Sequence, residues 1–186
     1  MWLLSLISFL LLGGYLLLSA MRFGIPDMVS DTYYQLQGCT GSEVIGDKRK
    51  GNYGFVFSIV MLAVAVMMMI CLLDTGRGVQ CLAFLGCAGL AFVAIAPNYV
   101  DKDELSVHKA GAIVAAVGCV GWCISVCLWV TFIVLLAYVI YLTFAYFYTM
   151  ADGIWYISSK RVHFHPWYFA EAAGFVDVFL TYWVII

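Results

Sequence analysis

The chain has 186 residues, of which 65% are hydrophobic and 11% are charged, and its mean hydropathy is +1.01. Roughly a quarter of the residues in a soluble domain are charged, so this composition excludes an ordinary water-soluble domain and indicates a protein whose solvent is lipid. The net charge of −2 provides no basic excess for binding nucleic acid.

Long apolar runs follow one another along the chain, and a helix needs about 20 such residues to cross the hydrocarbon core. The run from Ala110 to Met150 carries no charge and as one helix would extend about 60 Å, twice the thickness of that core. Two spans with a turn near Trp129 are therefore expected in it, or one kinked or re-entrant span, which would leave five in total. The sequence predicts an all-α integral membrane protein with a single transmembrane domain over residues 1–186, a bundle of about six helices at residues 2–21, 53–73, 79–97, 108–128, 130–150 and 166–186.

Positive residues are distributed unevenly between the predicted loops. The loops at 22–52, 98–109 and 151–165 hold every lysine and arginine except Arg77. Because the positive-inside rule assigns such loops to the cytoplasm, both termini are expected on the non-cytoplasmic side of a plasma or inner membrane. Cys39 falls in the first of these loops, and the reducing cytoplasm agrees with its lack of a loop partner for a disulfide.

Small residues recur every four positions in two predicted helices. Since small side chains let helix backbones approach closely in lipid, we predict helix-packing contacts there. Stacked cysteines could instead build a metal or redox site, but no histidine or carboxylate shares their face. The residues of these two stripes are Gly111, Ala115, Cys119, Cys123 and Cys127 in one helix and Ala83, Cys87 and Ala91 in the other.

The last predicted span contains two carboxylates, Glu171 and Asp177. A carboxylate in the hydrocarbon region is costly unless it is protonated, paired or hydrated. No lysine or arginine is expected at the depth of Asp177, so Asp177 should be neutral or face a water-filled cavity. Intramembrane carboxylates often mark function; a structural hydrogen bond is the alternative.

Tyrosines of the preceding span could complete a polar path with these carboxylates. Tyr138, Tyr141 and Tyr148 follow helical spacing and form a stripe of hydroxyl groups, although core or interfacial tyrosines would give the same pattern. Counted from the cytoplasmic helix ends, Asp177 is level with Tyr141 and Glu171 with about Tyr146. These tyrosines are the expected partners of the carboxylates.

Three histidines, His108, His163 and His165, are placed near the cytoplasmic side together with several carboxylates. Imidazole and carboxylate groups are ligands for zinc and other divalent metals. Their spacing matches no metal-binding helix motif, so no metal or other cofactor is expected. The alternative is a metal site at the three histidines with catalysis by Asp31, His108 and Glu171.

Three segments carry a family resemblance: Ser30-Asp31-Thr32-Tyr33-Tyr34, which is expected to begin a short helix with Ser30 as its cap, Leu82-Ala83-Phe84-Leu85 leading to Ala96-Pro97, and His108 opening the next helix. Over about half of its length the chain resembles a group of uncharacterised small polytopic membrane proteins of gut anaerobes and their phages. This resemblance implies a multi-pass fold and no particular activity.

These features favour a non-enzymatic membrane protein that forms a small ion- or solute-conducting assembly. Its polar path is expected to contain Asp177, Glu171 and the tyrosine stripe, and its partners are the lipid bilayer and either further copies of the chain or a partner membrane subunit. One alternative is an intramembrane metal-dependent lipid hydrolase. The other is a structural subunit of a larger membrane complex, bound through the small-residue stripes.

Overall fold

The computed structural model describes residues 1–36, 53–97, 102–150, 156–157, 160–161 and 164–186. Its helices are α1 (Trp2–Phe23), the 3-10 helix η1 (Val29–Asp31), α2 (Thr32–Leu36), α3 (Phe55–Asp74), α4 (Gln80–Ile95), α5 (Lys102–Met150) and α6 (Pro166–Ile185). Two short strands, β1 (Tyr156–Ile157) and β2 (Lys160–Arg161), pair antiparallel. Among the described residues, α1, α3, α5 and α6 are long and apolar enough to cross a membrane. The prediction of a predominantly helical chain with helices long and apolar enough to cross a membrane is confirmed.

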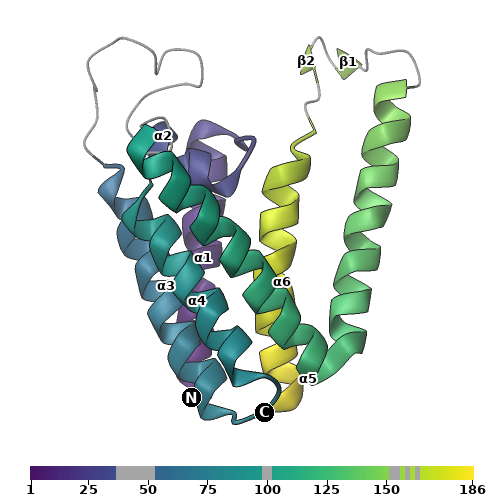
Figure 1. Ribbon diagram of the computed structural model, residues 1–186. Helices are drawn as coiled ribbons and strands as arrows, with labels where there is room; N and C mark the ends of the chain where they lie inside the picture. Colours follow the sequence, from purple (N-terminus) through teal and green to yellow (C-terminus); the bar gives the residue numbers. More distant parts are fainter. Residues whose placement is uncertain (37–52, 98–101, 151–155, 158–159, 162–163) are drawn as a thin grey trace.

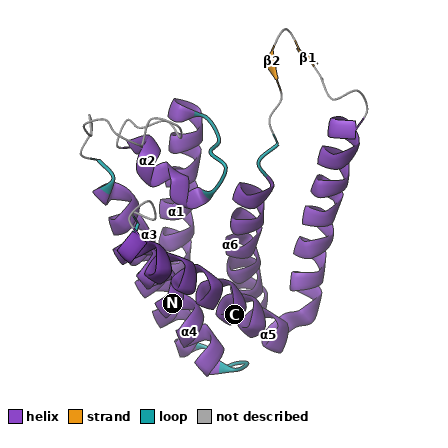
Figure 2. Ribbon diagram, turned by 45° about the horizontal axis from the view of Figure 1, so that its top comes forward, coloured by secondary structure: helices purple, strands orange, loops and turns teal. Residues whose placement is uncertain are grey.

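Helix α5 bends sharply at one residue, Cys127, whose backbone leaves the helical region with φ −150° and ψ 82°. The bend lies two residues before the predicted turn at Trp129. Because this extended geometry is open to any residue, the chain reverses there without Gly or Pro. The first arm of α5 (102–126) lies along α4, and the second arm (128–150) returns beside α6, apart from α3 and α4 (Figure 1, Figure 2).

The helices alternate in direction. Both termini, the turn between α3 and α4, and the bend of α5 lie at one end of the bundle (Figure 1). The far ends of α1, α3 and α4 lie at the other, together with α2. Helix α4 is shorter than the span predicted at residues 79–97, and α5 begins at Lys102, six residues before the predicted start at 108.

Glycines set the close approach of α4 and the first arm of α5. A Cβ atom added to Gly118 would lie 2.4 Å from the Gly86 backbone nitrogen, and one added to Gly89 would lie 2.4 Å from the Ala115 nitrogen. One added to Gly111 would lie 2.9 Å from the Gly89 carbonyl oxygen. The helix pair is thus packed backbone against backbone, as small residues permit in an apolar solvent.

Helix α1 buries most of its polar side chains in the bundle and exposes apolar ones. Its buried residues are Ser5, Ser8, Leu12, Tyr15 and Ser19, whereas leucines such as Leu3, Leu10 and Leu17 are exposed. This is the reverse of a helix on the surface of a soluble protein. The arrangement is typical of a helix whose outer face contacts lipid, and Ser5 and Tyr15 form hydrogen bonds within the protein.

Candidate functional site

The centre of the candidate site is Asp177, in the middle of α6 and only 3% exposed. Its Oδ1 atom accepts hydrogen bonds from the Thr131 hydroxyl of the second arm of α5 (3.2 Å) and from the Thr181 hydroxyl one turn later in α6 (3.4 Å). The Cys123 thiol of the first arm also contacts this carboxyl group. Within the described residues, no lysine or arginine forms an ion pair with Asp177. The carboxyl group is therefore held by neutral donors from both sides of the bend.

The expected pairing of Asp177 with Tyr141 is wrong. Asp177 is level with Thr131, whereas the Tyr141 ring packs on Phe169, with 4.7 Å between ring centroids. The prediction assumed that the two helices end at the same level, but α5 extends well beyond the start of α6. The resulting error of ten residues corresponds to about 15 Å along a helix.

The other tyrosines of the stripe have structural partners or are not described. Tyr138 donates a hydrogen bond to the Pro166 carbonyl oxygen at 3.0 Å, at the start of α6. The side chain of Tyr148 lies outside the described part of the chain. Tyr138 and Tyr141 thus pack the two helices together above the level of Asp177.

The second carboxylate, Glu171, stabilises the end of another helix. Its Oε2 atom accepts a hydrogen bond from the Val29 backbone N–H at 2.6 Å, and the Ser30 N–H also contributes. These are N–H groups of η1, which have no partner within their own helix. Ser30 was expected to act as a cap, but its hydroxyl has no hydrogen-bond partner in the described part of the chain. Glu171 performs the capping from a distant position in the sequence.

Two further contacts hold the segment of residues 24–36 against the bundle. The Tyr15 hydroxyl donates to the Thr32 hydroxyl at 2.6 Å, and Thr32 donates to the Val29 carbonyl oxygen at 2.7 Å. His165 pairs with Asp27 at 3.1 Å. The segment therefore docks on both α1 and α6, and Glu171 binds its backbone N–H groups.

Replacing Glu171 by alanine is expected to release this segment. The η1 N–H groups would lose their acceptor, at a cost of about 1–3 kcal/mol for buried donors left unpaired, so amide hydrogen exchange at Val29 and Ser30 should accelerate. Asp27→Ala, which removes only the exposed ion pair, is the matched control and should change exchange little. Equal protection of η1 in Glu171→Ala and the parent would contradict this role.

Sequence reasoning missed the inward-facing residues of α1 and the two threonines. Ser5 accepts a hydrogen bond from the Trp183 indole N–H at 2.7 Å, and the buried Ser8 hydroxyl has no partner among the described residues. The sequence carried a signal for them, since Ser5, Ser8, Tyr15 and Ser19 recur at intervals that place them on one helical face. Thr131 and Thr181 carried no such signal.

The described histidines of the alternative metal site each have another partner in the structure. The His108 ring lies against the Ala96 carbonyl oxygen, with Nδ1 at 2.8 Å, and His165 pairs with Asp27. His163 lies outside the described residues. No group of three metal-ligating side chains occurs among the residues that the structure describes. Of the alternative catalytic residues, Asp31 and Glu171 lie near each other at η1, where Asp31 accepts a hydrogen bond from the Met28 N–H. His108 lies elsewhere, where α4 and α5 meet.

The small-residue stripes lie mostly where α4 faces α5. Gly111, Ala115 and Cys119 contact α4 closely, Ala83, Cys87 and Cys123 are buried, and Ala91 is partly buried. The Cys87 and Cys119 thiols contact each other across the helix pair. Cys127 forms the bend and so leaves the stripe. Cys39 lies outside the described residues.

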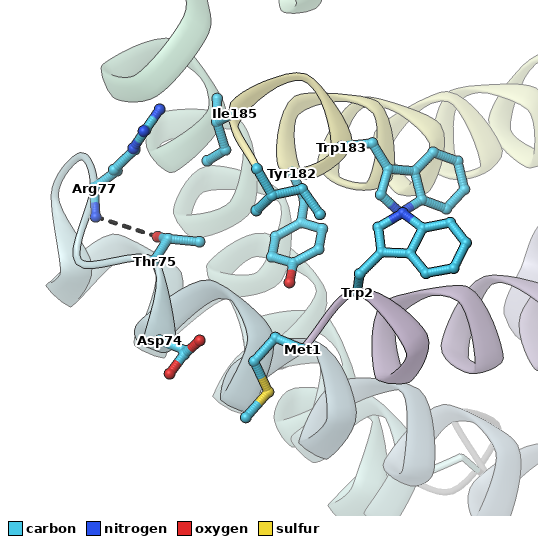
Figure 3. Close-up of a pocket in the computed structure, with 9 residues that line it drawn as sticks. Met1, Trp2, Asp74, Thr75, Arg77, Tyr182, Trp183 and Ile185 are labelled. Atoms are coloured by element: carbon cyan, nitrogen blue, oxygen red, sulfur yellow. Dashed lines mark hydrogen bonds between the residues drawn. The ribbon is translucent and has the colours of Figure 1, made fainter.

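An open pocket of about 690 Å³ lies at the terminal end of the bundle, among the start of α1 and the ends of α3 and α6. Tyr182 and Trp183 of α6, Trp2 of α1, and Asp74 and Arg77 line it (Figure 3). Tyr182 comes five residues after Asp177 in α6, so the pocket lies about one helical turn beyond Asp177. Comparisons of the chain with protein-family models, with curated proteins and with solved structures found no match.

Proposed function

We propose that the chain crosses the membrane six times, with each arm of α5 acting as one span. At 1.5 Å per residue the first and second arms extend about 37 Å and 34 Å, enough for a hydrocarbon core of about 30 Å. The 16 residues of α4 extend about 24 Å, and local thinning of the bilayer accommodates a helix of this length. The common position of both termini at one end of the bundle supports this arrangement.

Two cysteines test the orientation. The positive-inside rule places Cys39 in the cytoplasm and the exposed Cys81, at the start of α4, on the opposite side. In intact cells an impermeant thiol reagent should therefore label Cys81 and spare Cys39, and a permeant reagent should label both. Labelling of Cys39 alone by the impermeant reagent would show that the orientation is the opposite of the one proposed.

We propose further that the protein conducts a small ion or solute along the polar interior between α1, α5 and α6. The observation that carries this proposal is the position of Asp177, a buried carboxyl group held only by hydroxyl and thiol groups among the described residues. Placing an ionisable group in a lipid environment costs free energy, and such groups typically mark an ion or proton pathway. The buried polar residues of α1, among them Ser8 with a hydroxyl that has no partner in the described part of the chain, provide further hydrogen-bonding groups inside the bundle.

Reconstitution into liposomes tests this function. Purified protein should increase the flux of protons or of Na⁺, K⁺ or Cl⁻, each measured separately under an imposed gradient, above that of protein-free liposomes. Equal flux with and without protein for every ion, over a range of pH and voltage, would contradict conduction. The structural-subunit alternative would then be favoured.

A further inference from the structure

We propose that the terminal pocket binds the zwitterionic phosphodiester headgroup of a phospholipid. The proposal concerns only this pocket and the membrane location of the chain, so it stands or falls independently of conduction through the interior. A volume of about 690 Å³ lies within the usual range for small-molecule sites, about 300–1,000 Å³.

Aromatic rings on one side of the pocket suit a cationic group. In Figure 3 the indoles of Trp2 and Trp183 lie on one side of the Tyr182 ring, and Asp74 and Arg77 lie on the other. The Trp183 indole is fixed by its hydrogen bond to Ser5, whereas Trp2 is 59% exposed. Tryptophan faces are the strongest aromatic partners for quaternary ammonium groups.

Opposite charges at the pocket rim suit a zwitterion. Asp74 and Arg77 are both exposed, and within the described residues neither belongs to an ion pair. Asp74 can therefore attract, across the pocket, the ammonium group that packs on the indoles, and Arg77 can bind a phosphate, for which its guanidinium has the matching geometry. Since α1 begins at this pocket while α3 and α6 end there, helix dipoles of both signs also meet at it.

The position of the pocket favours a lipid as the source of this headgroup. It lies at the end of helices whose outer faces are apolar, including Leu3 and Ile7 of α1. In a six-span arrangement this end is at the membrane–water interface, where headgroups lie and where tryptophan and tyrosine are enriched. A lipid can thus place its headgroup in the pocket and its acyl chains along α1.

The experiment measures the thermal unfolding midpoint of the full-length protein in a neutral maltoside detergent. Short-chain phosphatidylcholine should raise the midpoint in a saturable manner, because a ligand of the folded state stabilises it. Phosphatidylglycerol with the same acyl chains lacks the ammonium group and should be markedly weaker. Free glycerophosphocholine, which has no acyl chains, is the third probe. If it raises the midpoint as much as the lipid does, the headgroup chemistry is supported, but the ligand is a free phosphodiester and not a lipid.

Variants identify the residues that carry the effect. Asp74→Asn, Arg77→Gln and Trp2→Leu should each weaken the apparent affinity for phosphatidylcholine by about threefold to thirtyfold. Trp129→Leu is the matched control, since Trp129 is 74% exposed, lies beside the bend at the same end of the bundle and does not line the pocket. Equal binding of the two lipids, unchanged binding in Asp74→Asn, or the same loss in Trp129→Leu as in Trp2→Leu would overturn the proposal.

Discussion

Alanine at Gly118 is expected to destabilise the folded protein by about 1–3 kcal/mol, although it adds only one methyl group. The added Cβ would lie within 3 Å of the Gly86 nitrogen, the Gly86 Cα and the Leu82 carbonyl oxygen. All three are backbone atoms, so no side chain can rotate away, and α4 must move off α5. Gly89→Ala, which meets the Ala115 backbone in the same way, should have a similar effect.

The measurement is unfolding of the purified variants in mixed micelles with increasing denaturing detergent. Gly174→Ala is the matched control, because it is also a helical glycine and an added Cβ finds nothing within 4 Å. That variant should be neutral or more stable by up to about 1 kcal/mol, since alanine favours the helix. If Gly118→Ala and Gly174→Ala unfold alike, the close approach of α4 and α5 does not contribute to stability.

Asparagine at Asp177 is expected to preserve the fold, within about 1 kcal/mol of the parent. The amide oxygen can accept from the Thr131 and Thr181 hydroxyls as the carboxyl group does, and no cation is left unpaired among the described residues.

Leucine at the same position has similar bulk but no acceptor. Thr131 would then lose its partner in α6, while Thr181 can turn to a backbone carbonyl of its own helix. The expected cost is about 1–3 kcal/mol for a buried donor left unpaired, measured by the same unfolding titration. Equal stability of Asp177→Leu and Asp177→Asn would show that these hydrogen bonds do not hold α6 to α5.

The helices that are long and apolar enough to cross a membrane could be predicted because hydropathy is a property of composition over about 20 residues. The reversal inside the long apolar run was also placed within two residues, at Cys127 against the predicted Trp129. The apolar run is about twice as long as the hydrocarbon core is thick, so the chain has to reverse within it. How the two arms then align with their neighbours depends on side-chain packing, which a single sequence does not reveal.

The candidate site shows this limit most clearly. Asp177 was identified because a carboxylate within an apolar helix is costly wherever its partners lie. Its partners were not identified, because the position of α5 along the axis of α6 is set by packing such as that of Tyr141 on Phe169. Glu171 was expected in the polar path, but the docked η1 segment uses it as a cap, and no local pattern links residues so distant in sequence.

The most direct test of the account compares ion flux through the parent and through Asp177→Asn in liposomes of equal protein content. The variant keeps the shape of the side chain and most of its hydrogen bonds but cannot carry a charge, so flux should fall at least about tenfold or change its ion preference. Asp27→Asn, which alters an exposed carboxylate outside the interior, should conduct like the parent. Unchanged flux and selectivity in Asp177→Asn would contradict the claim that this carboxyl group lines the conducting path.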